Sequence, residues 1–124
     1  MVLTGFSRGA IACGYIGLRN DRVARLWRGT LAATHFDGVR TKWPYADCDR
    51  VSAGTRLLRL NGRPVFVAHE GSAAETKDYV MASGAGASFT FETLPYRNHT
   101  DSWVLRDAPA REQARDWIRC VVSI

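Results

Sequence analysis

Residues 101–124 read DSWVLRDAPAREQARDWIRCVVSI and carry the clearest fold signal of the chain. Pro109 suits the first turn of a helix, and Asp107 just before it favours a helix N-terminus. Apolar residues then recur at helical spacing: Ala110, Ala114, Trp117, Ile118 and Val121. The pattern predicts an amphipathic helix at about 109–122. A short strand is expected before it, at 102–106.

Upstream of this helix, short apolar runs alternate with turn residues, which predicts strands. The stretch FTFET at 89–93 alternates with period two, as a half-buried strand does. Asn61-Gly62 lies between the apolar runs 57–60 and 65–68, and this arrangement favours a two-residue β-hairpin. Further strands are expected over residues 25–36 and 77–83.

Several short strands followed by one amphipathic helix predict a mainly β fold with a single core. The chain has 124 residues, of which 46% are hydrophobic, so it can bury one core. A strongly bent sheet or a partly open barrel would use the helix to close one end. Trp117 would then be the structural anchor that holds the helix on the core.

These segments together resemble the pleckstrin-homology (PH) domain. SWVLRDAPAREQARDWIRCVVSI is similar to the last strand and helix of that family, with Trp117 at its tryptophan position. RGTLAATH, TRLLRLNGRPVFVAHE and FTFET resemble earlier strands. The resemblance implies a partly open barrel of two near-orthogonal antiparallel sheets, capped by the C-terminal helix. It covers residues 28–124 and leaves 1–27 as an N-terminal extension.

The net charge of +5 favours an acidic partner. The PH-like resemblance places the binding surface on the basic loop and hairpin at about 37–63. The expected ligand-binding residues are Arg40, Lys42, Arg50, Arg56 and Arg63. Of the basic positions with which the family holds phosphoinositides, only Arg56 matches. The chain is therefore expected to be a non-catalytic adaptor that binds a protein partner, with weak binding of anionic lipid headgroups or phosphoinositides as the alternative.

Two further alternatives stay open. DRVSAGTRLLRLNGRPV is similar to a stretch of PDZ domains, which would imply binding of a C-terminal peptide. Trp27, Trp43, Tyr45 and Tyr96 lie among arginines, which is suitable material for stacking on single-stranded nucleic acid.

No enzyme signature is expected, and neither is a metal or cofactor. His35, His69, His99 and Cys48 are too widely spaced to match the ligand pairs of structural zinc sites. The three histidines are therefore interpreted as unrelated.

Three widely spaced cysteines do not suggest a disulfide framework, so an intracellular location is expected, cytoplasmic or peripheral to membrane or cytoskeleton. Cys120 is expected to be a buried thiol. The sequence contains no signal-peptide pattern at its start and no transmembrane stretch.

Overall fold

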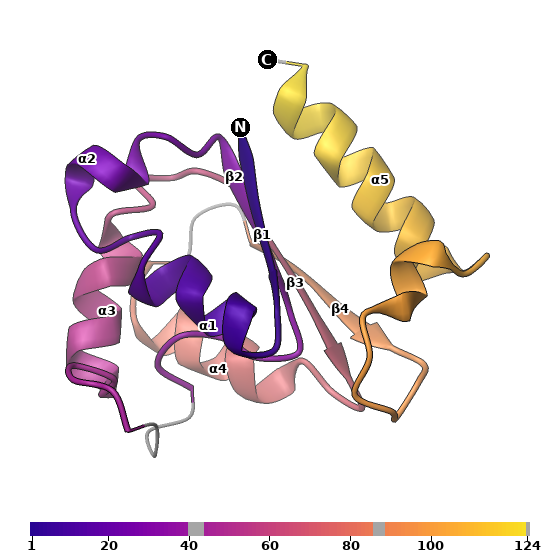
Figure 1. Ribbon diagram of the computed structural model, residues 1–124, viewed down its shortest axis with the longest axis horizontal. Coiled ribbons are helices and arrows are strands. Elements are labelled where there is room, and N and C mark those ends of the chain that lie inside the picture. The colour runs from indigo at the N-terminus through magenta and orange to yellow at the C-terminus, as the bar shows by residue number, and fades with distance from the viewer. Residues whose placement is uncertain (40–43, 86–88, 124) are drawn as a thin grey trace.

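The computed structural model describes residues 1–39, 44–85 and 89–123. A four-stranded sheet forms its centre (Figure 1). The strands are β1 (Val2–Phe6), β2 (Gly29–Ala33), β3 (Val65–Glu70) and β4 (Phe89–Leu94). They are all parallel and lie in the order β1-β2-β3-β4. All carboxyl ends of the strands therefore meet at one edge of the sheet.

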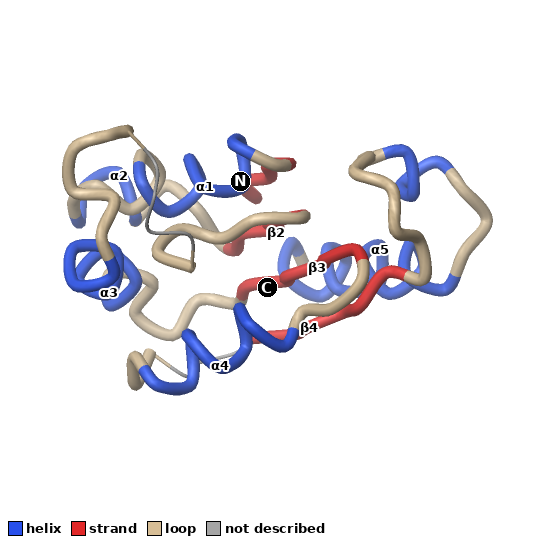
Figure 2. Tube along the Cα trace, turned by 90° about the horizontal axis from the view of Figure 1, so that it is seen from below, coloured by secondary structure: helices blue, strands red, loops and turns tan. Residues whose placement is uncertain are grey.

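The helices cover both faces of this sheet. They are α1 (Arg8–Tyr15), α2 (Asp21–Ala24), α3 (Arg50–Leu58), α4 (Ala74–Ala82), the 3₁₀ helix η1 (Ser102–Leu105) and α5 (Pro109–Val122). Connections between neighbouring parallel strands are right-handed, so strands in sequential order place their crossover helices on one face. Figures 1 and 2 show α1, α3 and α4 on that face and α5 on the other.

Each face has its own hydrophobic core. Val65 and Val67 point towards the crossover helices, where Leu57 and Val80 pack against them. Phe66 points to the opposite face, where it meets Trp103 and the apolar side of α5. Side chains alternate between the two faces along a strand, so every residue from 65 to 68 is buried on one side or the other.

This architecture contradicts the expected antiparallel, mainly β barrel. The sheet is single and parallel, and helices separate its strands, so the fold is α/β and not a PH-like barrel. The physical reason lies in the apolar runs. A strand that is buried on both faces is a continuous apolar segment, as at 65–68. Because the helix before this segment was not recognised in the sequence, two successive apolar runs were interpreted as the two strands of a hairpin.

Several local predictions are wrong for the same reason. Residues 57 and 58 belong to α3, whose N-terminus is capped by Asp49 through a 2.8 Å bond from the Ser52 N–H. Asn61 and Gly62 do adopt positive φ, of 49° and 81°, but their turn joins α3 to β3. Most of the expected strand at 77–83 is α4, and the one at 102–106 is mainly η1.

The C-terminal helix is confirmed, since α5 begins at Pro109 and ends at Val122. Its contribution to the core differs from the prediction. Trp117 is only half-buried, whereas Trp103 is 1% exposed and fills the core under the helix. Cys120, expected to be buried, is exposed.

Residues 1–27 are an integral part of the sheet layer. They form β1, α1 and α2, and β1 pairs with β2 along its length. Among the helices that the structure describes, none is long and apolar enough to cross a membrane.

Candidate active site

Ser7 lies at the sharp turn between β1 and α1. Its backbone has φ 58° and ψ −119°, a conformation that L-residues rarely adopt. The turn brings the strand and the helix into close contact, because a Cβ on Gly5 would lie 2.2 Å from the carbonyl oxygen of Gly9. Only glycine fits at position 5. The backbone therefore presents Ser7 at the carboxyl edge of the sheet.

The Ser7 side chain is not used to cap the helix. Ser7 occupies the N-cap position of α1, where a serine hydroxyl ordinarily accepts a hydrogen bond from an N–H of the first turn. No such bond forms here. Instead, Ser7 Oγ lies 3.0 Å from His99 Nε2. The hydroxyl is thus directed at a histidine that is 92 residues away in the sequence.

His99 connects Ser7 to a carboxylate. It lies in the loop after β4, and its Nδ1 is 3.2 Å from Oε1 of Glu70, the last residue of β3. Burial raises the pKa of the Glu70 carboxyl, but hydrogen bonds from its own backbone, from Thr34 and from His99 outweigh that effect, and the pKa lies below its usual value. Glu70 is therefore ionised at neutral pH.

The ionised carboxylate determines the tautomer of His99. A carboxylate can only accept hydrogen bonds, so His99 Nδ1 must carry the proton that it shares with Glu70 Oε1. Nε2 of the neutral ring then has a free lone pair. That nitrogen accepts the hydrogen bond from the Ser7 hydroxyl. Ser7, His99 and Glu70 therefore form a hydrogen-bonded chain: the Ser7 hydroxyl donates to His99 Nε2, and His99 Nδ1 donates to the Glu70 carboxylate.

Aromatic and imidazole rings surround this chain. The centroid of the Phe6 ring lies 4.9 Å from that of His99. The His35 ring is 5.6 Å from His99 and 6.2 Å from His69, so the three histidines interpreted as unrelated lie together at this edge. Among the residues that the structure describes, no group of three or more His, Cys, Asp or Glu side chains could hold a metal ion.

Of the five basic residues expected to bind a ligand, the structure describes Arg50, Arg56 and Arg63. Arg40 and Lys42 fall outside the described residues. Arg50, at the start of α3, is exposed and reaches the Val39 carbonyl at 3.5 Å. Arg63, in the turn before β3, is half-buried and donates to the Arg59 carbonyl at 2.6 Å. The structure does not bring Arg50 and Arg63 to a common pocket with the Ser7 edge.

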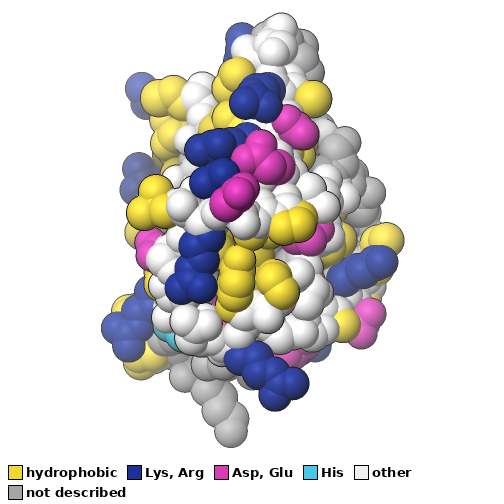
Figure 3. Space-filling view, turned by 90° about the vertical axis from the view of Figure 1, so that its right-hand side faces the viewer, with side chains coloured by type: hydrophobic (Ala, Val, Ile, Leu, Met, Phe, Trp, Pro, Cys, Tyr) yellow, Lys and Arg dark blue, Asp and Glu magenta, His cyan; other side chains and the backbone are white. Residues whose placement is uncertain are grey.

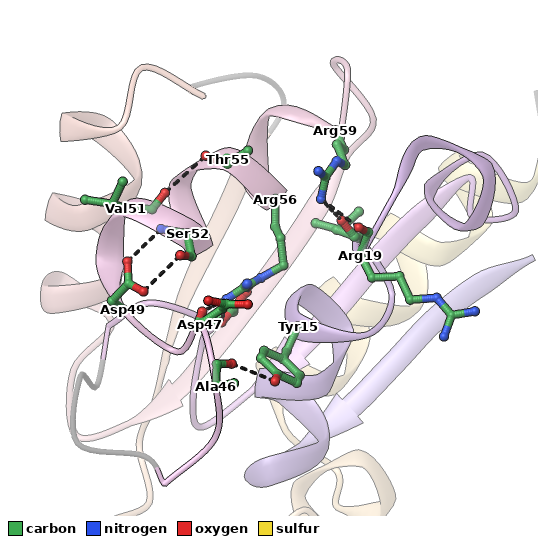
Figure 4. A network of polar contacts seen from close by, with 12 residues as sticks. Tyr15, Arg19, Ala46, Asp47, Asp49, Val51, Ser52, Thr55, Arg56 and Arg59 are labelled. Atoms are coloured by element: carbon green, nitrogen blue, oxygen red, sulfur yellow. Dashed lines mark hydrogen bonds and ion pairs between the residues drawn. The ribbon is translucent and has the colours of Figure 1, made fainter.

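The Arg56 side chain is buried within the protein and does not face solvent. It is 7% exposed, and it donates two hydrogen bonds to Asp37, at 2.7 and 3.0 Å. A third bond reaches the carbonyl of Asp47 at 2.9 Å. Figure 4 shows the Arg56 side chain reaching from α3 towards Asp47, in the loop before α3, and Tyr15, at the end of α1. The Arg56 guanidinium therefore binds the protein's own carboxylate.

Charges of both signs are interspersed on the α5 side of the molecule, shown in Figure 3. On α5 itself, Arg115 pairs with Glu112 at 3.3 Å and Arg119 pairs with Asp116 at 2.8 Å. These exposed pairs are three residues apart, and each stabilises the helix by a few tenths of a kcal/mol at most. This face is therefore not a uniformly basic surface.

Of the candidate site residues that the sequence analysis missed, Ser7 lies in a recognisable motif. Residues 5–9 read GFSRG, a Gly-x-Ser-x-Gly pattern placed between a strand and a helix. That pattern is typical of a nucleophilic serine on a strand-to-helix turn. Glu70 and His99 have no recognisable local motif: Glu70 is the last residue of β3, and His99 lies in the polar loop after β4.

Comparison of the chain with protein-family models, with curated proteins and with solved structures finds no match.

Proposed function

We propose that this chain is a serine hydrolase that cleaves carboxylic esters through Ser7, His99 and Glu70. The observation that carries the proposal is the pair of contacts at His99, 3.0 Å to Ser7 Oγ and 3.2 Å to Glu70 Oε1. The same three roles recur in serine hydrolases of unrelated fold. Their order along this chain, serine, then acid, then histidine, is that of the α/β-hydrolases.

Each residue has a defined task in acyl transfer. Ser7 Oγ attacks the carbonyl carbon of the ester, and its proton moves to His99 Nε2. Glu70 stabilises the imidazolium that forms and keeps the ring oriented. When the tetrahedral intermediate collapses, His99 returns the proton to the leaving alcohol. Water then attacks the acyl-serine by the same route, which releases the carboxylic acid and restores Ser7.

The start of α1 supports the developing negative charge on the substrate oxygen. Amide groups in the first turn of a helix have no acceptor within the helix, and they carry the positive end of its dipole. Arg8 follows Ser7 as the first residue of α1. In hydrolases with this turn, the N–H of the residue after the nucleophile is one of the oxyanion donors. By position, Arg8 corresponds to that residue.

Covalent labelling tests the proposal directly. The purified chain is incubated with a fluorophosphonate probe, and the modified peptide is identified by mass spectrometry. We expect modification at Ser7, together with hydrolysis of short p-nitrophenyl esters. Ser7→Ala should lose both, whereas Ser123→Ala, at the far end of α5, should keep both. An unmodified wild-type chain, or equal labelling of Ser7→Ala, would refute the proposal.

This proposal replaces the expectation of a non-catalytic module as the best-supported function. Binding of a protein, an anionic lipid or a single-stranded nucleic acid stays a prediction of the sequence, since the structure bears on where the basic residues lie and not on what they bind.

A further inference from the structure

Thr34 is the first residue after β2, and its backbone is strained. Its φ is 85°, a value that is a genuine outlier for a β-branched residue. The Thr34 N–H donates to the Ala68 carbonyl at 2.7 Å, and this bond extends the pairing between β2 and β3 by one residue. The side chain is 0% exposed. Strained residues of this kind persist where the surrounding structure requires them, often near functional sites.

The Thr34 hydroxyl is bonded to the carboxylate of the candidate triad. Oγ1 donates to Glu70 Oε2 at 2.9 Å, while the other oxygen, Oε1, faces His99 Nδ1 at 3.2 Å. A carboxylate is planar, so a partner on one oxygen fixes the direction of the other. Thr34 and His99 thus hold the two oxygens of Glu70 from different sides.

The length of the Glu70 side chain makes such a second partner important. Glutamate has one more rotatable bond than aspartate, and side-chain freedom must be restricted before a carboxylate can orient a ring. Here Glu70 is the last residue of β3, and its side chain is 14% exposed. The Thr34 hydroxyl removes the remaining freedom at the carboxylate.

We infer that Thr34 is a positioning residue. It orients Glu70, and through Glu70 it holds the His99 ring in position to bond Ser7 Oγ. The inference rests on the proposed hydrolase function. The hydrogen bonds of Thr34 that the described residues show go to Glu70 and Ala68, and none goes to Ser7. The strain at Thr34 is accounted for by this role, because the positive φ turns the hydroxyl towards β3.

Ester hydrolysis by three variants tests the inference. Thr34→Val keeps the branched shape and removes only the hydroxyl, and we expect kcat to fall about 10- to 100-fold while KM stays unchanged, since a hydrogen bond to a charged group is lost. Thr34→Ser keeps the hydroxyl and should recover most of kcat. Thr30→Val changes a buried threonine at the other end of β2 and should leave kcat unchanged. If Thr34→Val does not fold, as judged by circular dichroism, Thr34→Ala takes its place.

A double-mutant cycle separates positioning from a merely structural effect. If Thr34 acts through Glu70, adding Thr34→Val to Glu70→Gln should cost no further activity. A further loss of tenfold or more in the Glu70→Gln background, or an unchanged kcat in Thr34→Val alone, would overturn the inference. Either of these two results would overturn the role of Thr34 and leave the proposed function standing. The proposed function is refuted separately, if the wild-type chain lacks Ser7-dependent hydrolysis.

Discussion

The buried ion pair between Arg56 and Asp37 gives a quantitative prediction for Arg56→Met. Methionine fills a similar volume, so the main change is the loss of the cation. Asp37 is 5% exposed, and the substitution removes the two bonds of 2.7 and 3.0 Å that Arg56 donates to it. The carboxylate would remain buried without its cationic partner.

The expected cost is about 3–5 kcal/mol of unfolding free energy, the range found when one partner of a buried pair is removed. For a domain of this size that is a large part of the total stability. Urea unfolding followed by tryptophan fluorescence and circular dichroism measures the free energy. Arg25→Met, which changes an exposed arginine after α2, is the matched control and should stay within about 0.5 kcal/mol of wild type.

A second variant checks the cause of that loss. Asp37→Leu combined with Arg56→Met removes both charges, so it should recover part of the stability lost in Arg56→Met alone. A loss below about 1 kcal/mol in Arg56→Met would refute the reasoning and would restore Arg56 as a candidate ligand-binding residue. A loss that small is what we would expect if the Arg56 guanidinium were exposed to solvent, because exposed ion pairs contribute little to stability.

Three further predictions concern the core, the thiols and the response to acid. Trp103→Ala should cost about 3–5 kcal/mol because Trp103 is 1% exposed, and Trp117→Ala should cost clearly less because Trp117 is half-buried; equal losses in urea unfolding would contradict this ranking. A maleimide under native conditions should modify Cys120 alone, since Cys13 and Cys48 are buried and burial raises the pKa of Cys13 to about 12; mass spectrometry of labelled peptides decides it. The pKa of Glu70 lies below its ordinary 4.5, despite burial, because of its hydrogen bonds, so its contribution to stability is present above pH 4.5 and lost as pH falls through the lower folded value. Glu70→Gln should therefore weaken the acid-induced loss of stability, and identical unfolding curves for both proteins below pH 4.5 would argue against it.

The sequence predicted the elements whose signals are local. Pro109 and the apolar stripe behind it identified α5, and the alternation at 89–93 identified β4 as a strand. Positive φ at Asn61-Gly62 was also predictable from residue type. Each of these features depends on a few neighbouring residues, which is why the pattern sufficed.

Topology was not predictable from the same patterns because it depends on what covers each strand. The runs at 65–68 and 57–60 are both mainly apolar, yet the first lies in a strand buried on both faces and the second covers the end of helix α3 and the turn after it. The cap at Asp49 and the spacing of Ala53 and Leu57 were the available signals for α3. Once helices separate the strands, parallel pairing follows and a hairpin does not.

Only one part of the candidate site, the turn that carries Ser7, could be recognised in the sequence. Gly5, Ser7 and Gly9 form a recognisable pattern because strand, turn and helix are adjacent in the chain. Glu70 and His99 become partners only because β3 and β4 end at the same edge as β1. Because Glu70 and His99 meet only in the folded sheet, no pattern of neighbouring residues in the sequence could predict their contact.

The parallel strand order also determines when, during synthesis, the proposed site can form. β1 and β4 are the two outer strands, so the contact between Ser7 and His99 spans the full width of the sheet and 92 residues of sequence. At about 5–20 residues per second, the ribosome adds that stretch in roughly 5–20 s. Throughout that interval Ser7 has been made and His99 has not. If Ser7 is the nucleophile that we propose, a nascent chain carries an unactivated hydroxyl, and reactivity towards a fluorophosphonate would begin only after the last strand has joined the sheet.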